Sequence, residues 1–196
     1  MEAARRRQPA TPSPPSGRIA GARLFFALWP DPLARTHLAR WAADLHRTCG
    51  GRRVRDEQLH ATLAFLGNVP LARLPELARL AACVSVSGFS LRFDAPGCWP
   101  RQRLLWAAPA AVPDDLAVLA ARLASALQAA GLRAEDRPYF PHVTLVRDAT
   151  CRGLPVLDGF AWDVGEFVLV ESKLGSAGAT YRLIGRWPLA ARVPSA

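Results

Sequence analysis

The sequence predicts a single α+β domain in which strands come in pairs instead of alternating with helices. Its 196 residues are 51% hydrophobic, which suffices for the core of one domain or of two small lobes that share an interface. Short apolar runs of strand length occur next to one another, and three longer segments carry apolar residues at helical spacing. This mixed order favours an α+β fold over a doubly wound parallel sheet.

The first half of the folded part is expected to contain two strands and two helices. The run RLFFALW at 23–29 has strand length and stops at a Pro-Asp-Pro turn. Apolar residues then recur at helical spacing over 33–49, and two glycines end that helix. The stretch LHATLAFL at 59–66 is expected to be a strand. Pro70 opens a second helix, whose leucines are expected to face one way: Leu71, Leu74, Leu77 and Leu80.

The second half is expected to contain the clearest helix and most of the strands. FSLRFDAP at 89–96 and RLLWAAP at 103–109 are two strand candidates joined by a turn-rich hairpin connection. The helix at 113–131 has Pro at its start, two aspartates in its first turn and Gly at its end. Three strands then close the chain, the last two joined by a glycine-rich turn: HVTLV at 142–146, FAWDVGEFVLVES at 160–172 and TYRLIGRWPL at 180–189.

The two ends of the chain are expected to lie outside this domain. Residues 1–21 are rich in Pro, Ser and Arg and contain almost nothing that could be buried, so we expect a disordered leader. Its arginine cluster at 5–7 is expected to be solvated. Residues 192–196 are interpreted as a short tail, which leaves 22–191 as one folded domain.

The charge of the chain allows a nucleic-acid partner without demanding one. A net charge of +9 and a pI near 10.8 would attract polyanions, of which nucleic acid is the commonest for a basic protein. Of the 25 basic residues only Lys173 is a lysine, and biased coding composition produces such a preference as readily as phosphate binding does. Neither a Walker phosphate loop nor a Rossmann glycine pattern is present.

The cysteines and the hydropathy pattern indicate a cytoplasmic protein. Cys49, Cys83, Cys98 and Cys151 form no Cys-x-x-Cys pair and are expected to be isolated thiols. The sequence shows neither a secretory signal pattern nor an apolar run long enough to span a bilayer. We therefore expect a monomer in a reducing cytoplasm, with no membrane partner.

Two of the four histidines occur in the same short pattern, His-x-Thr-Leu. His60 and Thr62 stand in HATLAFLG, and His142 and Thr144 stand in HVTLVRD. The composition of the chain gives such a double occurrence a chance on the order of 1 in 7,000. Because alternate side chains of a strand share a face, each pattern places an imidazole and a hydroxyl on one side of its strand. The other two histidines, in the first helix, lack the pattern and are expected at the surface.

Two imidazoles and two hydroxyls suit displacement at a phosphodiester. A neutral imidazole removes a proton from the entering oxygen while a protonated one delivers a proton to the leaving oxygen. Threonine hydroxyls can donate hydrogen bonds to the non-bridging oxygens. A metal site fits less well, because the patterns bring no carboxylate or thiolate. Arg147 could bind the phosphate, although strict alternation would place it on the opposite face from His142.

HATLAFLG and RPYFPHVTLVRD resemble the two signature motifs of the 2H phosphoesterase superfamily, and most closely those of the RNA 2′,3′-cyclic phosphodiesterases, also called 2′-5′ RNA ligases. RLFFALWP resembles the opening strand of that family, and ESKLGSAGATYRLIGRWPL resembles its closing hairpin. The resemblance covers most of the chain and implies a bilobal fold, in which two related lobes with antiparallel sheets face each other across a cleft. The long arginine-rich leader departs from the family pattern.

The resemblance implies that the enzyme opens a terminal 2′,3′-cyclic phosphate on RNA to a 2′-phosphate, without a metal or a cofactor. His60 with Thr62 and His142 with Thr144 would form the two half-sites, and Arg147 would contact the phosphate. His142 is assigned as the base toward water and His60 as the acid, although the reverse assignment fits equally and the ligating reaction exchanges the roles.

Tyr139 and Phe140 are placed where an aromatic ring could stack on the terminal base, although at least one of them is expected to pack in the core. Two alternative functions stay open: a 2H phosphodiesterase for another cyclic or 2′-5′-linked nucleotide, and an RNA-binding module without turnover. The retained histidine pair argues against the binding module, because arginine would serve binding alone.

Overall fold

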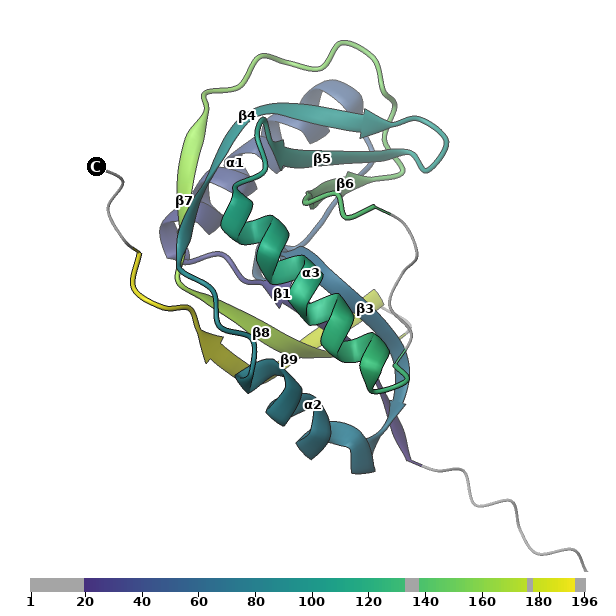
Figure 1. Ribbon diagram of the computed structural model, residues 1–196. Helices are drawn as coiled ribbons and strands as arrows, with labels where there is room; N and C mark the ends of the chain where they lie inside the picture. The colour runs from purple at the N-terminus through teal and green to yellow at the C-terminus, as the bar shows by residue number, and fades with distance from the viewer. Residues whose placement is uncertain (1–19, 133–137, 176–177, 193–196) are drawn as a thin grey trace, which may run out of the picture.

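The computed structural model describes residues 20–132, 138–175 and 178–192, so the predicted leader and tail lie almost wholly outside the described residues. Within these ranges the chain forms nine strands, three α-helices and two short 3-10 helices (Figure 1). Their order is β1 (Gly21–Leu28), α1 (Pro32–Cys49), β2 (Arg52–Arg53), η1 (Asp56–Gln58), β3 (Ala61–Pro70), η2 (Leu71–Arg73), α2 (Leu74–Ala82), β4 (Phe89–Trp99), β5 (Leu104–Pro109), α3 (Asp114–Ala129), β6 (Val143–Arg147), β7 (Phe160–Val164), β8 (Glu166–Gly175) and β9 (Gly178–Pro188).

The strands form one curled antiparallel sheet that consists of two related halves. Its order is β7-β4-β5-β6-β3-β1-β8-β9, with β2 added to β6. In one half β1, α1 and β3 follow one another, and β1 pairs with β3. In the other half β5, α3 and β6 do the same, and β5 pairs with β6. This arrangement confirms the α+β class and the two lobes that the sequence predicts.

Helices cross between the two halves and hold them together. Helix α1 packs against β6 and β7, and α3 packs against β3 and α2, so each helix covers strands of the other half (Figure 1). Leu38, Trp41 and Leu45 of α1 are fully buried, and the Trp41 indole donates a hydrogen bond to the Asp158 carbonyl at 3.1 Å. Because one hydrophobic cluster runs through both halves, the space between them has fixed walls.

Two strand predictions need correction. FAWDVGEFVLVES was expected to be one strand, but it breaks at Gly165 into β7, which pairs with β4, and β8, which pairs with β1 and β9. The two strands therefore belong to opposite halves, and an apolar pattern cannot reveal which partner a strand takes. The sequence analysis also missed β2, which has two residues and hence no periodicity to detect.

The second helix is also shorter and less regular than predicted. Residues Leu71–Arg73 form a 3-10 turn before α2 begins at Leu74. Leu77 is fully buried, whereas Leu71 is 43% exposed, so the leucines do not form one buried stripe. The change from three residues per turn to 3.6 shifts the direction of the side chains at that point.

The expectation of four isolated thiols is wrong. Cys98, near the end of β4, forms a disulfide with Cys151, and the two Cα atoms are 5.8 Å apart. Their 53-residue separation gives no sequence signal, because the fold alone brings them together. Cys49, which is buried, and Cys83, which is exposed, are free thiols.

The two histidines of α1 differ in exposure. His46 is exposed as expected, whereas His37 is half-buried and stacks on Phe160 at 4.9 Å between ring centres.

In the described ranges, no helix has the length and apolar character needed to cross a membrane.

Candidate active site

The two His-x-Thr patterns meet where the halves of the sheet join. Strands β3 and β6 pair through Ala61 and Val143, the residues that follow the two histidines. Ala61 and Val143 are both buried. The histidine before each of them and the threonine after it therefore project to the opposite face of the sheet. Antiparallel geometry then sets each histidine across from the threonine of the other strand, and leaves the histidine Cα atoms roughly 8 Å apart along the diagonal.

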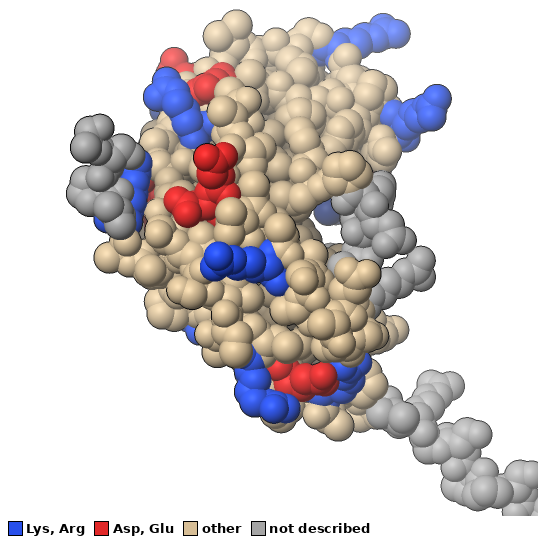
Figure 2. All heavy atoms as spheres, in the orientation of Figure 1, with Lys and Arg blue, Asp and Glu red and all other residues tan. Residues whose placement is uncertain are grey.

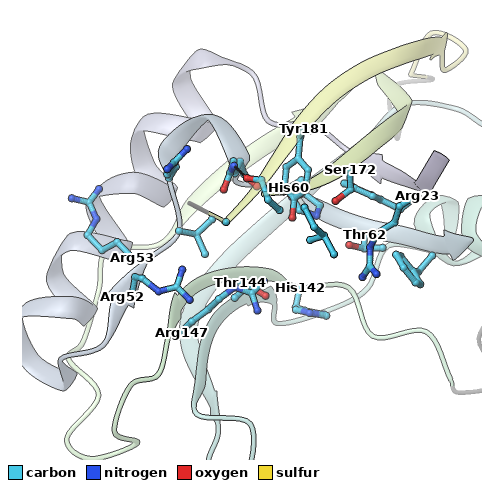
Figure 3. A pocket seen from close by; sticks show the side chains of 18 residues that line it. Arg23, Arg52, Arg53, His60, Thr62, His142, Thr144, Arg147, Ser172 and Tyr181 are labelled. Atoms are coloured by element: carbon cyan, nitrogen blue, oxygen red, sulfur yellow. Dashed lines mark hydrogen bonds between the residues drawn. The ribbon is translucent and has the colours of Figure 1, made fainter. Parts of the chain in front are cut away.

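This face of the sheet forms the floor of a cleft of about 640 Å³. All four predicted side chains line it: His60, Thr62, His142 and Thr144 (Figure 3). The protonated forms of the rings also interact, since the charge of His142 contributes to lowering the pKa of His60. The fold therefore brings the two half-sites together as the sequence predicts.

The leucine of each pattern marks a β-bulge. In the β1–β3 pair, Ala27 lies opposite Thr62 and Phe26 opposite Ala64, so Leu63 is the extra residue. In the β5–β6 pair, Trp106 lies opposite Thr144 and Leu105 opposite Val146, so Leu145 is extra. Both leucines are buried, 8% and 0% exposed respectively, and they anchor the bulges in the core. The shared leucine thus has a structural role next to the shared polar pair.

The second bulge also explains how Arg147 reaches the cleft. Strict alternation would turn it away from His142, but an extra residue reverses the alternation beyond the bulge. Leu145 and Val146 are consequently both buried, and Arg147 lines the cleft with His142. The position that corresponds to Arg147 in the first half is Phe65, which lines the same cleft. The Arg23 guanidinium lies over the Phe65 ring, 4.6 Å from its centre.

Aromatic rings surround the imidazole of His60. Its ring stacks on Trp29 at 5.6 Å between centres, and Phe25 and Tyr181 pack around it at 4.8 and 5.3 Å. Its Nδ1–H donates to the Gln58 carbonyl at 2.6 Å, which leaves Nε2 to face the cleft. Burial lowers the pKa of His60 to about 4, with smaller contributions in the same direction from Arg147 and His142. His60 is therefore neutral at neutral pH.

His142 repeats this arrangement in the other half. Its Nδ1–H donates to the Phe140 carbonyl at 3.0 Å, again the carbonyl two residues earlier. Trp99 meets its ring edge-on at 4.7 Å, and Phe140 stacks at 5.9 Å. Both histidines thus have the same tautomer in their neutral forms, with the Nε2 lone pair available for a proton.

A second, apolar pocket of about 520 Å³ adjoins the cleft at Thr62, Phe65 and His142. Tyr139 and Phe140 line it, but they differ in exposure. The Phe140 ring is 46% exposed, whereas Tyr139 packs against the core and burial raises the pKa of its hydroxyl. One aromatic of the predicted pair is therefore available for stacking and the other is largely structural.

Sequence reasoning missed several residues that line the cleft. Arg52 and Arg53 reach it from β2, and Arg55 follows them. Only their clustering in GRRVR could have signalled a role. Tyr181, on β9, gave no signal because its place beside His60 depends on how the strands pair.

The described lining of the cleft contains no Asp, Glu or Cys. In the ranges that the structure describes, no group of three or more His, Cys, Asp and Glu side chains could hold a metal ion. The polar groups of the cleft are instead imidazoles, hydroxyls and guanidinium groups. The hydroxyls and guanidinium groups can donate hydrogen bonds to an anionic ester, and the imidazoles can also transfer protons.

Two facing imidazoles with fixed tautomers, two hydroxyls and an arginine in one cleft define a phosphoesterase of the two-histidine class. Residues 28–106 and 107–181 each match the family described as LigT like Phosphoesterase. The chain is 36% identical to the RNA 2′,3′-cyclic phosphodiesterase of Escherichia coli over 169 residues, which are 85% of this chain and 96% of the relative. It is 31% identical to the enzyme of the same name from Thermus thermophilus, over 85% of this chain and 90% of the relative. The chain belongs to the LigT-like phosphoesterase family.

Solved structures agree with this assignment. The crystal structure of E. coli LigT complexed with 3′-AMP superimposes with a TM-score of 0.79 at 34% identity, covering 87% of this chain and 99% of that one. The crystal structure of TT0787 of T. thermophilus gives a TM-score of 0.75 at 28% identity, covering 87% of this chain and 100% of that one. The two family matches divide the chain within β5, and each contains one His-x-Thr pattern.

Proposed function

We propose that this enzyme opens terminal 2′,3′-cyclic phosphates on RNA and leaves a 2′-phosphate. The observation that carries the proposal is the juxtaposition of the two half-sites across Ala61 and Val143. Support comes from the relatives named RNA 2′,3′-cyclic phosphodiesterase and from E. coli LigT, whose structures include complexes with phosphate and with 3′-AMP.

The reaction is an in-line displacement at phosphorus. One neutral imidazole takes a proton from water as the water oxygen bonds to phosphorus, opposite the 3′ oxygen. The bond from phosphorus to the 3′ oxygen breaks, and the second imidazole, protonated at Nε2, gives that oxygen its proton. Thr62 and Thr144 donate hydrogen bonds to the non-bridging oxygens, and Arg147 balances their charge. The exposed Phe140 ring offers a stacking surface for the terminal base.

The environment of His60 favours it as the base, which reverses the assignment made from the sequence. A general acid must be protonated, whereas His60, with its pKa lowered to about 4, is neutral at pH 7. A substrate with sulfur in place of the 3′ oxygen tests this choice, because a thiolate leaves without protonation. His142→Ala should then recover most of its activity on the sulfur substrate while His60→Ala does not. The opposite pattern would restore the original assignment.

Catalysis is proposed to need neither a metal nor a cofactor, since the histidines supply both proton transfers. One chain provides both half-sites, so a monomer is sufficient. The proposed substrate is intracellular RNA, which places the reaction in the cytoplasm. Run backwards, the same proton transfers would join a cyclic-phosphate end to a 5′-hydroxyl end by a 2′-5′ bond.

The proposal is tested by incubating the protein in EDTA with an oligonucleotide that ends in a 2′,3′-cyclic phosphate. We expect a 2′-phosphate product, and rates lowered about 10²- to 10⁴-fold in His60→Ala and in His142→Ala. Tight binding of the oligonucleotide without any product would indicate the RNA-binding module instead. Turnover of free cyclic or 2′-5′-linked nucleotides alone would indicate the other phosphodiesterase.

A further inference from the structure

The positive charge of the cleft is concentrated on one side of the histidine pair. Five arginines line it among the described residues, and no carboxylate does: Arg23, Arg52, Arg53, Arg55 and Arg147. Arg52, Arg53 and Arg147 lie on one side of the two histidines, and Arg23 lies on the other (Figure 3). By contrast, the face of the molecule that carries α2 and α3 shows positive and negative side chains intermixed (Figure 2).

The fold places these arginines together against their mutual repulsion. Arg52 is the direct partner of Arg147 across the β2–β6 pair, where like charges destabilise a sheet. The close approach of β2 depends on Gly51, which has a φ of +86° and whose Cβ, if present, would lie 2.5 Å from the Arg147 carbonyl oxygen. We call Arg52, Arg53 and Arg55 the arginine arm. A cluster that costs stability and occupies one side of a cleft is typical of an anion site.

The carboxylates that pair with Arg52 and Arg53 are weak competitors for these two arginines. Arg52 pairs with Asp148 at 3.5 Å, with side chains 70% and 64% exposed. Arg53 pairs with Asp56 at 2.9 Å, with side chains 38% and 52% exposed. Pairs this exposed contribute at most about 1 kcal/mol and are screened by salt. A phosphate can therefore replace the carboxylate and take two parallel hydrogen bonds from the guanidinium.

We propose that the arginine arm binds the backbone phosphates of the nucleotides that precede the cyclic end, so that the enzyme prefers RNA chains to mononucleotides. This inference rests on the proposed function, because it takes the cyclic phosphate to lie between the two histidines. Among the described residues, the apolar pocket beside His142 is lined by no Lys, Arg, Asp or Glu, so it suits an uncharged base rather than a polyanion. The RNA chain is therefore expected to run from the catalytic position across the arginine arm.

The test compares two double variants that remove the same charge. Arg52→Gln/Arg53→Gln removes two arginines of the arm. Arg47→Gln/Arg92→Gln removes two arginines outside the cleft, each 75% exposed and each paired with a nearby aspartate as the arm residues are. Hydrolysis is measured on a cyclic mononucleotide and on a hexanucleotide with the same end. Binding of a hexanucleotide that already carries a 2′-phosphate is measured over a range of salt concentrations, because binding reports on the arm without turnover.

In the arm variant we expect the ratio of kcat/KM for the hexanucleotide to that for the mononucleotide to fall about tenfold. The slope of log Kd against log salt concentration should become shallower by about 1 to 2. The control variant should keep the ratio and the slope of the natural protein. Equal losses on both substrates, an equal effect in the control variant, or a natural protein without any preference for length would overturn the inference. Failure of the proposed function would look different, since the natural protein would then leave the hexanucleotide unhydrolysed, with or without turnover of the mononucleotide.

Discussion

The two histidines of the cleft are alike in geometry and different in environment. Each donates Nδ1–H to the carbonyl two residues before it, Gln58 for His60 and Phe140 for His142. Their surroundings differ because Trp29, Tyr181 and Phe25 enclose His60, and this burial lowers its pKa to about 4. This burial keeps His60 neutral at neutral pH, with its Nε2 lone pair able to accept a proton.

The lowered pKa of His60 predicts a loss of stability in mild acid. The unfolded chain binds a proton at this residue below its ordinary pKa of 6.5, whereas the folded protein does so only below about 4. Stability linked to His60 is therefore complete above pH 6.5 and falls as the pH drops toward 4. We expect the free energy of unfolding of His60→Gln minus that of the natural protein to rise by about 2 to 3 kcal/mol from pH 7 to pH 4.5, because only the natural protein loses the stability linked to His60. Urea titrations at both values measure this difference, and a constant difference would contradict it.

A two-residue strand and a β-bulge place three of the arginines that line the cleft. The two-residue strand β2 supplies Arg52 and Arg53, and the bulge at Leu145 turns Arg147 toward the cleft. The repeated leucine has the same position in both bulges, which explains why the sequence pattern extends one residue beyond the threonine.

Two neighbouring glycines allow a matched test of how β2 is placed. Gly50 and Gly51 both have positive φ values, +66° and +86°. A Cβ at Gly50 would contact nothing within 4 Å, so Gly50→Ala should cost only about 1 kcal/mol of backbone strain. A Cβ at Gly51 would lie 2.5 Å from the Arg147 carbonyl oxygen and 2.9 Å from the Ala149 backbone. Gly51→Ala should therefore cost about 2 kcal/mol or more and also weaken phosphate binding. Equal unfolding midpoints of the two variants would contradict this placement.

The sequence predicted those features that depend on local pattern. Alternation correctly set His60 with Thr62 and His142 with Thr144, because two residues along a strand always share a face. It failed for Arg147, since a bulge is decided by the neighbouring strand and not by the strand itself. It failed again at Gly165, where one apolar run divides between two halves of the sheet. The meeting of both patterns in one cleft was expected only from the family resemblance, and their pairing through Ala61 and Val143 was not predicted, because no local signal carries either feature.

The molecule consists of two related halves, and the helix of each half covers strands of the other half. Because α1 covers β6 and β7 while α3 covers β3, separating the halves would expose the core of both. The main hydrophobic cluster therefore supports the cleft from both halves. The proposed reaction needs such support, since both of its proton transfers would depend on distances of about 3 Å.

The Cys98–Cys151 disulfide adds a covalent link within one half. It ties the end of β4 to the segment after β6 and closes a loop of 53 residues. A loop of this length predicts a stabilisation of about 2 to 4 kcal/mol in the oxidised protein. Cys98→Ala/Cys151→Ala should lower the unfolding temperature to that of the reduced natural protein, and reductant should have no further effect on the variant. An oxidised protein that is no more stable than this variant would contradict the expected contribution.

A crystal structure of the protein bound to a nucleoside 2′-phosphate would test whether both histidines act on one phosphate. We expect the phosphate to lie between His60 and His142, with Nε2 of each ring about 3 Å from oxygens of that one group. Thr62 and Thr144 should donate to its remaining oxygens. A phosphate that contacts one histidine alone, or that binds outside the cleft with both rings unoccupied, would contradict catalysis by the two half-sites on a single phosphorus.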